Sequence, residues 1–233
     1  MAANGHTLKA FDEELENLRS AIAEMGGLAQ RAIRDSMQAL TARDLDLAAV
    51  VVQRDRQLDG LDNDVARRAI SIMALRAPLA NDLREVIAAL KISGVIERIG
   101  DYAKNIAKRV PGVENTKIAP LSLLPEMAEV AASMVADALD AFAARDRTKA
   151  AMVLERDQVV DSFYNSIFRA LLTFMMENPH NITAAAHLLF IAKHLERIGD
   201  HATNIAEMVY FAETGEHLPE RARGGESGAA FAG

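Results

Sequence analysis

The pentapeptide Glu97-Arg98-Ile99-Gly100-Asp101 occurs twice in the chain and returns unchanged at residues 196–200. Apolar residues around each copy recur every three or four positions, which is the period of an amphipathic α-helix. The isoleucines then form one side of each helix, while Glu97, Asp101 and Asn105 stack on another side that we expect to face water. The sequence therefore predicts two equivalent helices at the centre of the fold, each with a row of acidic residues.

The likeness between the two halves extends well beyond the pentapeptide. Residues 25–63 align with residues 127–165 without a gap, so that Ala42-Arg43-Asp44 meets Ala144-Arg145-Asp146. A repeat of this length indicates a duplicated structural unit. Short connections between the helices of one unit predict that neighbouring helices run antiparallel.

Hydrophobic periodicity and the positions of helix-breaking residues predict six helices. Asp44 can cap the second helix, whereas Gly26-Gly27 weakens the first one locally. The helices are expected at about residues 8–42, 45–75, 79–110, 122–144, 148–177 and 183–212. We therefore predict an all-α fold of two tandem, pseudo-symmetric three-helix bundles. The boundaries that follow are 8–110 for the first bundle, 111–121 for a linker, 122–213 for the second bundle and 214–233 for a flexible tail.

Composition restricts the classes of function. A formal net charge of −7 disfavours general binding to nucleic acid, which requires a basic face, and it disfavours a polybasic membrane anchor. The absence of cysteine excludes disulfides, thiolate metal sites and cysteine nucleophiles. No apolar run is long enough for a membrane span, and the first residues lack the pattern of a signal peptide. We therefore expect a cytoplasmic protein.

Each unit contains two pairs of carboxylates spaced by four residues, at equivalent positions in both units. Like charges at this spacing repel each other unless a cation lies between them, and hard cations prefer oxygen ligands. Mg²⁺, Mn²⁺, Ca²⁺ and iron are therefore candidate ions, with iron, Mn²⁺ and Mg²⁺ favoured and Zn²⁺ less favoured. The alternative is a solvated acidic surface neutralised by nearby arginines. The candidate metal ligands are Asp55, Asp59, Glu97, Asp101, Asp157, Asp161, Glu196 and Asp200.

Two other features of the central helices have structural interpretations. Glycine within a helix costs up to about 1 kcal/mol relative to alanine, so Gly100 and Gly199 indicate close approach of a neighbouring helix. His187, His194 and His201 are spaced by seven residues and share one side of the last helix. A solvent-facing or partner-facing row is preferred for these histidines over a contribution to a metal site.

The duplicated units, each with Glu-Arg-Ile-Gly-Asp in its third helix, resemble the PhoU family of regulators associated with bacterial phosphate uptake. The resemblance extends from about Leu8 to Phe211 and includes Asp82-Leu83-Arg84 at the start of the third helix. One departure is Asn181-Ile182-Thr183, which stands at the equivalent place in the second unit.

The resemblance implies a cytoplasmic, homodimeric, non-enzymatic regulator that damps phosphate-starvation signalling. Its implied partners are the ATPase of the phosphate ABC transporter and a sensor histidine kinase. Some members bind metal clusters through motifs in which two carboxylates are spaced by four residues, and these motifs fall on the eight candidate ligands given above.

Two alternatives to a regulatory adaptor remain open from the sequence. One is a metal-dependent enzyme or metal store of the carboxylate-bundle type, although Glu177-Asn178-Pro179-His180, the one Glu-x-x-His string, is interrupted by proline. The other is a structural, dimerising bundle with an acidic surface. No phosphate-binding glycine loop, nucleophile elbow or zinc-protease motif is present, so the sequence gives no positive case for catalysis.

Overall fold

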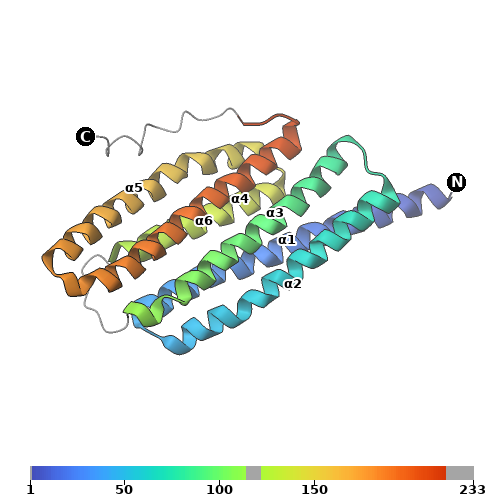
Figure 1. The fold of residues 1–233 in the computed structure, drawn as a ribbon. Helices are drawn as coiled ribbons and strands as arrows, with labels where there is room; N and C mark the ends of the chain where they lie inside the picture. The colour runs from blue at the N-terminus through green and yellow to red at the C-terminus, as the bar shows by residue number, and fades with distance from the viewer. Residues whose placement is uncertain (1, 114–121, 219–233) are drawn as a thin grey trace.

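The computed structural model describes residues 2–113 and 122–218, with side chains from residue 9 onward. These residues form six α-helices and two short 3₁₀ segments, and none of them forms a strand (Figure 1). The predicted all-α class is therefore confirmed. The elements are α1 (Ala2–Ala42), α2 (Leu45–Arg76), α3 (Ala80–Ala107), η1 (Val110–Val113), α4 (Leu123–Ala144), α5 (Arg147–Glu177), η3 (Pro179–Asn181) and α6 (Ile182–Thr214).

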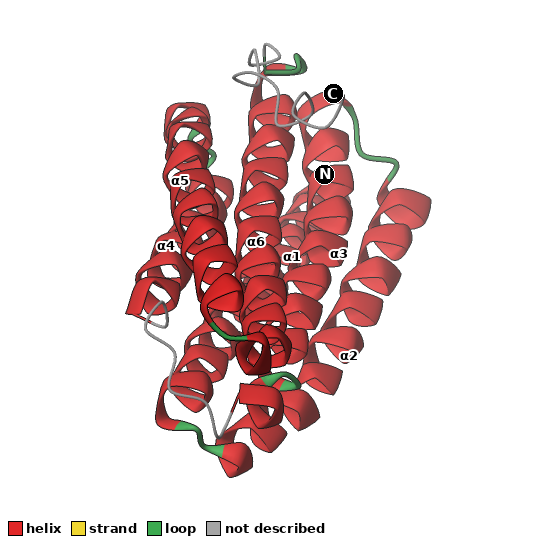
Figure 2. Ribbon diagram, turned by 60° about the vertical axis from the view of Figure 1, so that its left-hand side comes forward, coloured by secondary structure: helices red, strands yellow, loops and turns green. Residues whose placement is uncertain are grey.

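The helices pack as two units of three. Helices α1, α2 and α3 contact one another, as do α4, α5 and α6, and consecutive helices of the first unit run antiparallel (Figure 1). The two units are joined along their length, because α3 packs against α6 and α1 packs against α4 (Figure 2). The predicted pair of tandem three-helix bundles is thus confirmed, with α3 and α6 at the contact between them.

One continuous apolar core runs through both units. The isoleucine side of α3, represented by Ile92, Ile96 and Ile99, has no exposed surface, and Ile191 and Ile198 of α6 are equally buried. Alanines fill the positions between these residues and allow the helices to approach closely. The core therefore stabilises the contact between the units as well as each unit by itself.

The predicted cap at Asp44 is confirmed, and its repeat partner Asp146 caps α5 in the same way. Asp44 accepts a hydrogen bond from the backbone N–H of Leu47 at 2.9 Å, and Asp146 accepts from Thr148 N at 2.9 Å and from Lys149 N at 3.0 Å. The residue before each aspartate has a left-handed backbone, with φ 57° at Arg43. The α1–α2 connection and the α4–α5 connection therefore have the same local structure.

Several helix ends differ from the sequence prediction. Helix α1 begins at Ala2 and continues through Gly26-Gly27 without a break, because Gly26 packs directly against Leu139 of α4. Helix α3 ends at Ala107, and Val110 and Val113 of the following 3₁₀ segment are buried in the core. The start of the predicted linker is therefore packed. The remainder of that linker, residues 114–121, and residues 219–233 of the predicted tail lie outside the described residues.

Polar contacts at the start of α3 connect the two units. Glu85 is only 6% exposed and accepts hydrogen bonds from Arg19 of α1 and from Arg145 at the α4–α5 turn. The neighbouring Arg84 donates to the carbonyl oxygen of Ala212, near the end of α6, at 3.1 Å. Arg84 and the neighbouring Glu85 thus connect the first unit to the second.

Candidate functional site

Four of the predicted ligands come together between α2 and α3, where they form what we call the first acidic ridge: Asp55, Asp59, Glu97 and Asp101. Gly100 makes this possible, since a Cβ atom there would lie 3.4 Å from Oδ1 of Asp55 and 2.3 Å from Cδ1 of Leu58. The absence of a side chain therefore lets α2 approach α3 at this level. The prediction of close helix approach at Gly100 is confirmed.

The sequence analysis expected the acidic residues of α3 to face water, but the first acidic ridge is only partly open to solvent. Asp55 is 6% exposed at its side chain, and Glu97 and Asp101 are partly buried against α2. The helical wheel of α3 alone was misleading here, because α2 covers part of the surface on which the acidic residues lie. Of the four carboxylates, Asp59 is the one classed as exposed.

A lysine of α3, Lys104, lies among the carboxylates of the first acidic ridge. The Lys104 Nζ atom donates to Asp55 Oδ2 at 2.5 Å and also to Asp101 Oδ1. Burial by itself would lower the pKa of Lys104, but the hydrogen bonds and negative charges of Asp101 and Asp55 outweigh burial and raise that pKa. The ammonium group therefore stays charged and bridges α2 to α3.

Glu97 is in a less favourable position than the carboxylates that contact Lys104. Its pKa is raised by burial first, and then by the negative charges of Asp101, Asp59, Asp62 and Asp55. Asp62 accepts a hydrogen bond from the Ser93 hydroxyl at 2.7 Å. The ridge thus retains an excess of negative charge on the side of Glu97.

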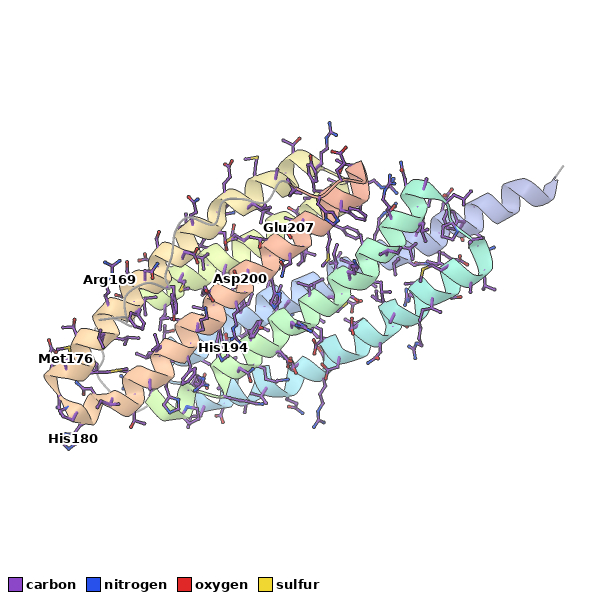
Figure 3. All side chains as sticks on the ribbon, turned by 45° about the horizontal axis from the view of Figure 1, so that its top comes forward. Arg169, Met176, His180, His194, Asp200 and Glu207 are labelled. Atoms are coloured by element: carbon purple, nitrogen blue, oxygen red, sulfur yellow. The ribbon has the colours of Figure 1, made fainter. Side chains whose placement is uncertain are left out.

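The equivalent residues of α5 and α6 form a second acidic ridge: Asp157, Asp161, Glu196 and Asp200. Asp157 again meets the glycine of the repeated motif, since a Cβ atom at Gly199 would lie 3.4 Å from its Oδ1 atom. Glu196 is 15% exposed at its side chain and accepts a hydrogen bond from Lys193 Nζ at 2.6 Å. Its Oε2 atom is buried and has no hydrogen-bond partner among the residues that the structure describes. Asp161 and Asp200 are exposed, and Asp200 is labelled in Figure 3.

The donor atoms of both ridges are oxygens, which suit hard cations. Within residues 9–113 and 122–218, however, no three histidine, aspartate or glutamate side chains converge closely enough to hold a metal ion. In the first ridge the place between Asp55 and Asp101 is taken by Lys104. The first ridge as it stands therefore does not fit a metal ion, and metal binding remains a prediction.

The three histidines of α6 do not form a solvent-facing row. They lie along the contact between α6 and α3, where Tyr102 stacks against both His194 and His201, with ring centroids 5.6 and 5.4 Å apart. His194 is labelled in Figure 3. Arg109 lies near His187, at 3.5 Å between Nη1 and Nδ1. The spacing of seven was thus a signal for packing between the units, which the sequence analysis missed because the two units were treated separately.

This packing predicts a specific sensitivity to acid. Burial, together with the charges of Arg109 and Arg197, lowers the pKa of His194 from 6.5 to about 4. The unfolded chain therefore takes up a proton at higher pH than the folded protein, so stability is lost as the pH falls from 6.5 towards 4. We expect a loss of about 1 kcal/mol from this residue, discounted because the ring is partly open to screening solvent.

The measurement is urea unfolding at pH 7 and pH 4.5 for the native chain and for His194→Phe, which keeps a ring against Tyr102. The variant should lose less stability between the two pH values than the native protein. Equal losses would contradict a role for His194 in acid sensitivity.

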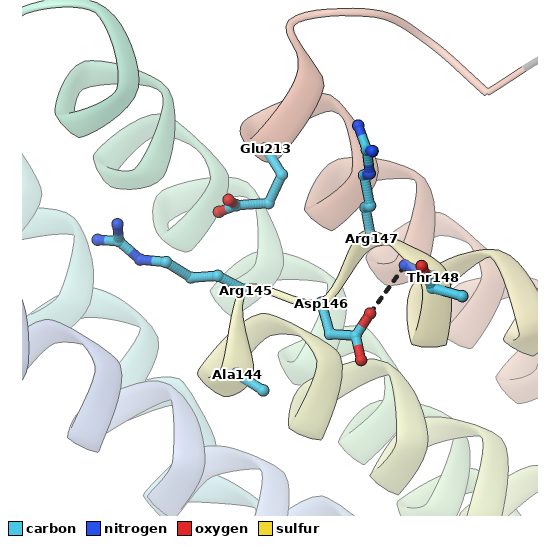
Figure 4. A pocket seen from close by; sticks show the side chains of 6 residues that line it. All are labelled: Ala144, Arg145, Asp146, Arg147, Thr148 and Glu213. Atoms are coloured by element: carbon cyan, nitrogen blue, oxygen red, sulfur yellow. Dashed lines mark hydrogen bonds between the residues drawn. The ribbon is translucent and has the colours of Figure 1, made fainter.

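A separate hollow, which the sequence analysis did not anticipate, lies at the α4–α5 turn. It has a volume of about 520 Å³ and opens widely to solvent, with Arg145, Arg147 and Glu213 around it (Figure 4). Asp146 lines the hollow and caps α5 through its Oδ1 atom. The wide opening and the small apolar lining do not favour a small-molecule pocket.

The fold and the ridges define a class of protein: a duplicated three-helix bundle with one paired-carboxylate motif in each unit. Comparisons with known proteins agree with this class. The model of the PhoU domain family matches residues 22–110 and 124–209. A Zymomonas mobilis protein named phosphate-specific transport system accessory protein PhoU homolog is 57% identical over 221 residues, covering 94% of this chain and 93% of the relative. A Rhizobium meliloti protein of the same name is 47% identical, covering 91% of each chain.

Two solved structures have the same architecture. The crystal structure of PhoU from Pseudomonas aeruginosa matches with a TM-score of 0.84 and 36% identity, covering 88% of this chain and all (100%) of that one. The phosphate transport system regulatory protein PhoU from Streptococcus pneumoniae matches with a TM-score of 0.84 and 28% identity, covering 90% of this chain and 100% of that one. The chain belongs to the PhoU domain family.

Proposed function

We propose that this protein is a non-enzymatic regulator of phosphate uptake and of phosphate-starvation signalling. Membership of the PhoU domain family is the observation that carries the proposal, together with relatives named as accessory proteins of a phosphate-specific transport system. No helix in the described part of the chain is both long and apolar enough to cross a membrane. A cytoplasmic location, at the inner side of a transporter, is part of the proposal.

The proposed mode of action is that of an adaptor between the ATPase of a phosphate ABC transporter and a sensor histidine kinase. The two acidic ridges are equivalent by duplication, so one chain offers two related surfaces of the same sign. A net charge of −7 favours approach to basic patches on partners. Charge complementarity of this kind mainly raises the rate of association and selects the partner. A homodimer would double the number of such surfaces.

Metal binding is a further element of the proposal, and it concerns the second ridge more than the first. Carboxylate oxygens of Asp157, Asp161, Glu196 and Asp200 would be the ligands, and iron, Mn²⁺ or Mg²⁺ the ions. A bound ion would reduce the negative charge that the ridge presents to a partner. No observation favours the alternative of a carboxylate-bundle enzyme, because both ridges lie between helix pairs rather than at the centre of a bundle.

The adaptor proposal predicts that neutralising both ridges weakens partner binding. We expect the variant Glu97→Gln, Asp101→Asn, Glu196→Gln, Asp200→Asn to associate roughly tenfold more slowly with the cytoplasmic part of the kinase or with the ATPase, because steering is lost. Surface plasmon resonance at low and high salt would measure both the rate and its salt dependence, which should flatten in the variant.

The matched control removes the same amount of charge away from the ridges. Exposed residues suited to it are Glu24, Glu155, Glu177 and Glu207, each replaced by glutamine. If the control slows association as much as the ridge variant does, net charge alone is responsible and the ridges are not docking surfaces.

A further inference from the structure

The Lys104 ammonium group lies between two carboxylates of the first acidic ridge. It contacts a carboxylate of α2, Asp55, and a carboxylate of α3, Asp101, and thereby joins the two motifs from which a metal site would be built. The Asp55 side chain is 6% exposed and that of Lys104 is 22% exposed. This is a partly buried ion pair between helices rather than a surface contact.

The contacts of this ammonium group are those that a cation in the ridge would make. An ammonium group supplies three N–H donors and one positive charge, and at least two of its donors are used on the two carboxylates. A divalent ion would compete for the same oxygen atoms and would have to displace the ammonium group from a partly buried position. Breaking a buried ion pair by removing one partner is costly, because the remaining charge is left without compensation.

The second repeat does not contain this arrangement. Thr203 occupies the position equivalent to Lys104, and its hydroxyl donates to the backbone carbonyl of Asp200 at 2.7 Å. A different lysine, Lys193, contacts Glu196, and the repeat partner of Lys193 is Gly94. Lys193 is 41% exposed at its side chain. The lysines that contact the two ridges, Lys104 and Lys193, therefore come from non-equivalent positions of the repeat.

We propose that Lys104 is a built-in counter-ion that closes the first acidic ridge to metal ions. The inference bears on the metal-binding element of the proposed function and is independent of the adaptor role, because a neutralised ridge can still contact a partner.

The test compares the native chain with Lys104→Met and with Lys91→Met, a control that removes an exposed lysine of the same helix. Each protein is purified without chelator or affinity-tag metal and equilibrated with Mn²⁺. Bound metal is then measured by elemental mass spectrometry, and binding by calorimetry. We expect Lys104→Met to hold about one more ion per chain than the native protein, with at least tenfold tighter binding at the added site, and Lys91→Met to behave as the native chain.

A second readout is thermal stability. Lys104→Met leaves Asp55 buried beside Asp101 without a cation, so the variant should melt earlier than the native protein and recover when Mn²⁺ is added. Because methionine could disturb the fold, Lys104→Thr, which introduces the residue of the second repeat, is measured in parallel. Circular dichroism identifies which variants are folded.

Two results would overturn the inference. The first is a native protein whose bound Mn²⁺ falls when Asp55→Asn and Asp101→Asn are introduced, since the ridge would then hold metal with Lys104 present. The second is a folded Lys104→Met or Lys104→Thr variant that binds no more Mn²⁺ than the native chain. Partner association, measured separately, decides the adaptor role and does not depend on either result.

Discussion

Replacing Glu85 by alanine is expected to lower the free energy of unfolding by about 2–3 kcal/mol. The carboxylate is nearly buried and accepts from Arg19 at 2.6 Å and from Arg145 of the other unit, so its removal leaves two guanidinium groups without their shared partner. Those guanidinium groups keep some access to solvent, with side chains 24% and 43% exposed, which limits the loss. Urea unfolding followed by circular dichroism would measure it.

The control for this substitution is Glu16→Ala. Glu16 contacts the same Arg19 at 3.1 Å, but its side chain is 69% exposed. Exposed pairs of this kind contribute at most about 1 kcal/mol. Equal effects of the two substitutions would show that burial of Glu85 between the units contributes nothing beyond an ordinary surface pair.

Replacing Gly100 by alanine should destabilise the protein by about 1–2 kcal/mol, although the same change inside an open helix would stabilise it by up to about 1 kcal/mol. The new Cβ atom would lie 2.3 Å from Cδ1 of Leu58, a residue only 2% exposed and therefore restricted in how far it can move. The expected consequence is a local separation of α2 from α3, measurable as a lower melting temperature.

The second repeat supplies the control for Gly100. At Gly199 the same Cβ atom would lie 3.3 Å from the nearest atom, Cγ1 of Val160, so crowding is mild and is offset by the better helix propensity of alanine. Gly199→Ala should change the stability by less than about 0.5 kcal/mol. A loss as large as that of Gly100→Ala would mean that the two helix contacts are equally tight.

The sequence was sufficient for the fold because its signals were local and repeated. The period of the apolar residues, the Asp44 cap and the glycine of each pentapeptide all act within a helix or between consecutive helices, and the duplication allowed each to be checked against its copy. The helix ends were less predictable. Val110 and Val113 are buried by contacts from other helices, which no local pattern records.

The candidate site was only partly predictable, because contacts between different helices leave no local pattern in the sequence. The sequence grouped the eight carboxylates into two sets, one in each unit, since spacing by four places residues on one side of a helix. It could not show that α2 covers the α3 side of the first ridge, nor that Lys104 reaches two carboxylates on different helices. The histidines of α6 were misassigned because their neighbour, Tyr102, lies on a helix almost a hundred residues away.

Covalent duplication has an evolutionary consequence at the contact between α3 and α6. In a homodimer of single units, the residues across the two-fold axis would be identical, so Tyr102 would face another tyrosine rather than His201. A fused pair is free of this restriction, and each half can mutate without changing the other. Lys104 and Thr203 stand at equivalent positions of the two units, as do Arg84 and Thr183, and these differences are outcomes of that freedom. Gene fusion thus allowed one ancestral module to specialise its two descendants while they continued to share a single core.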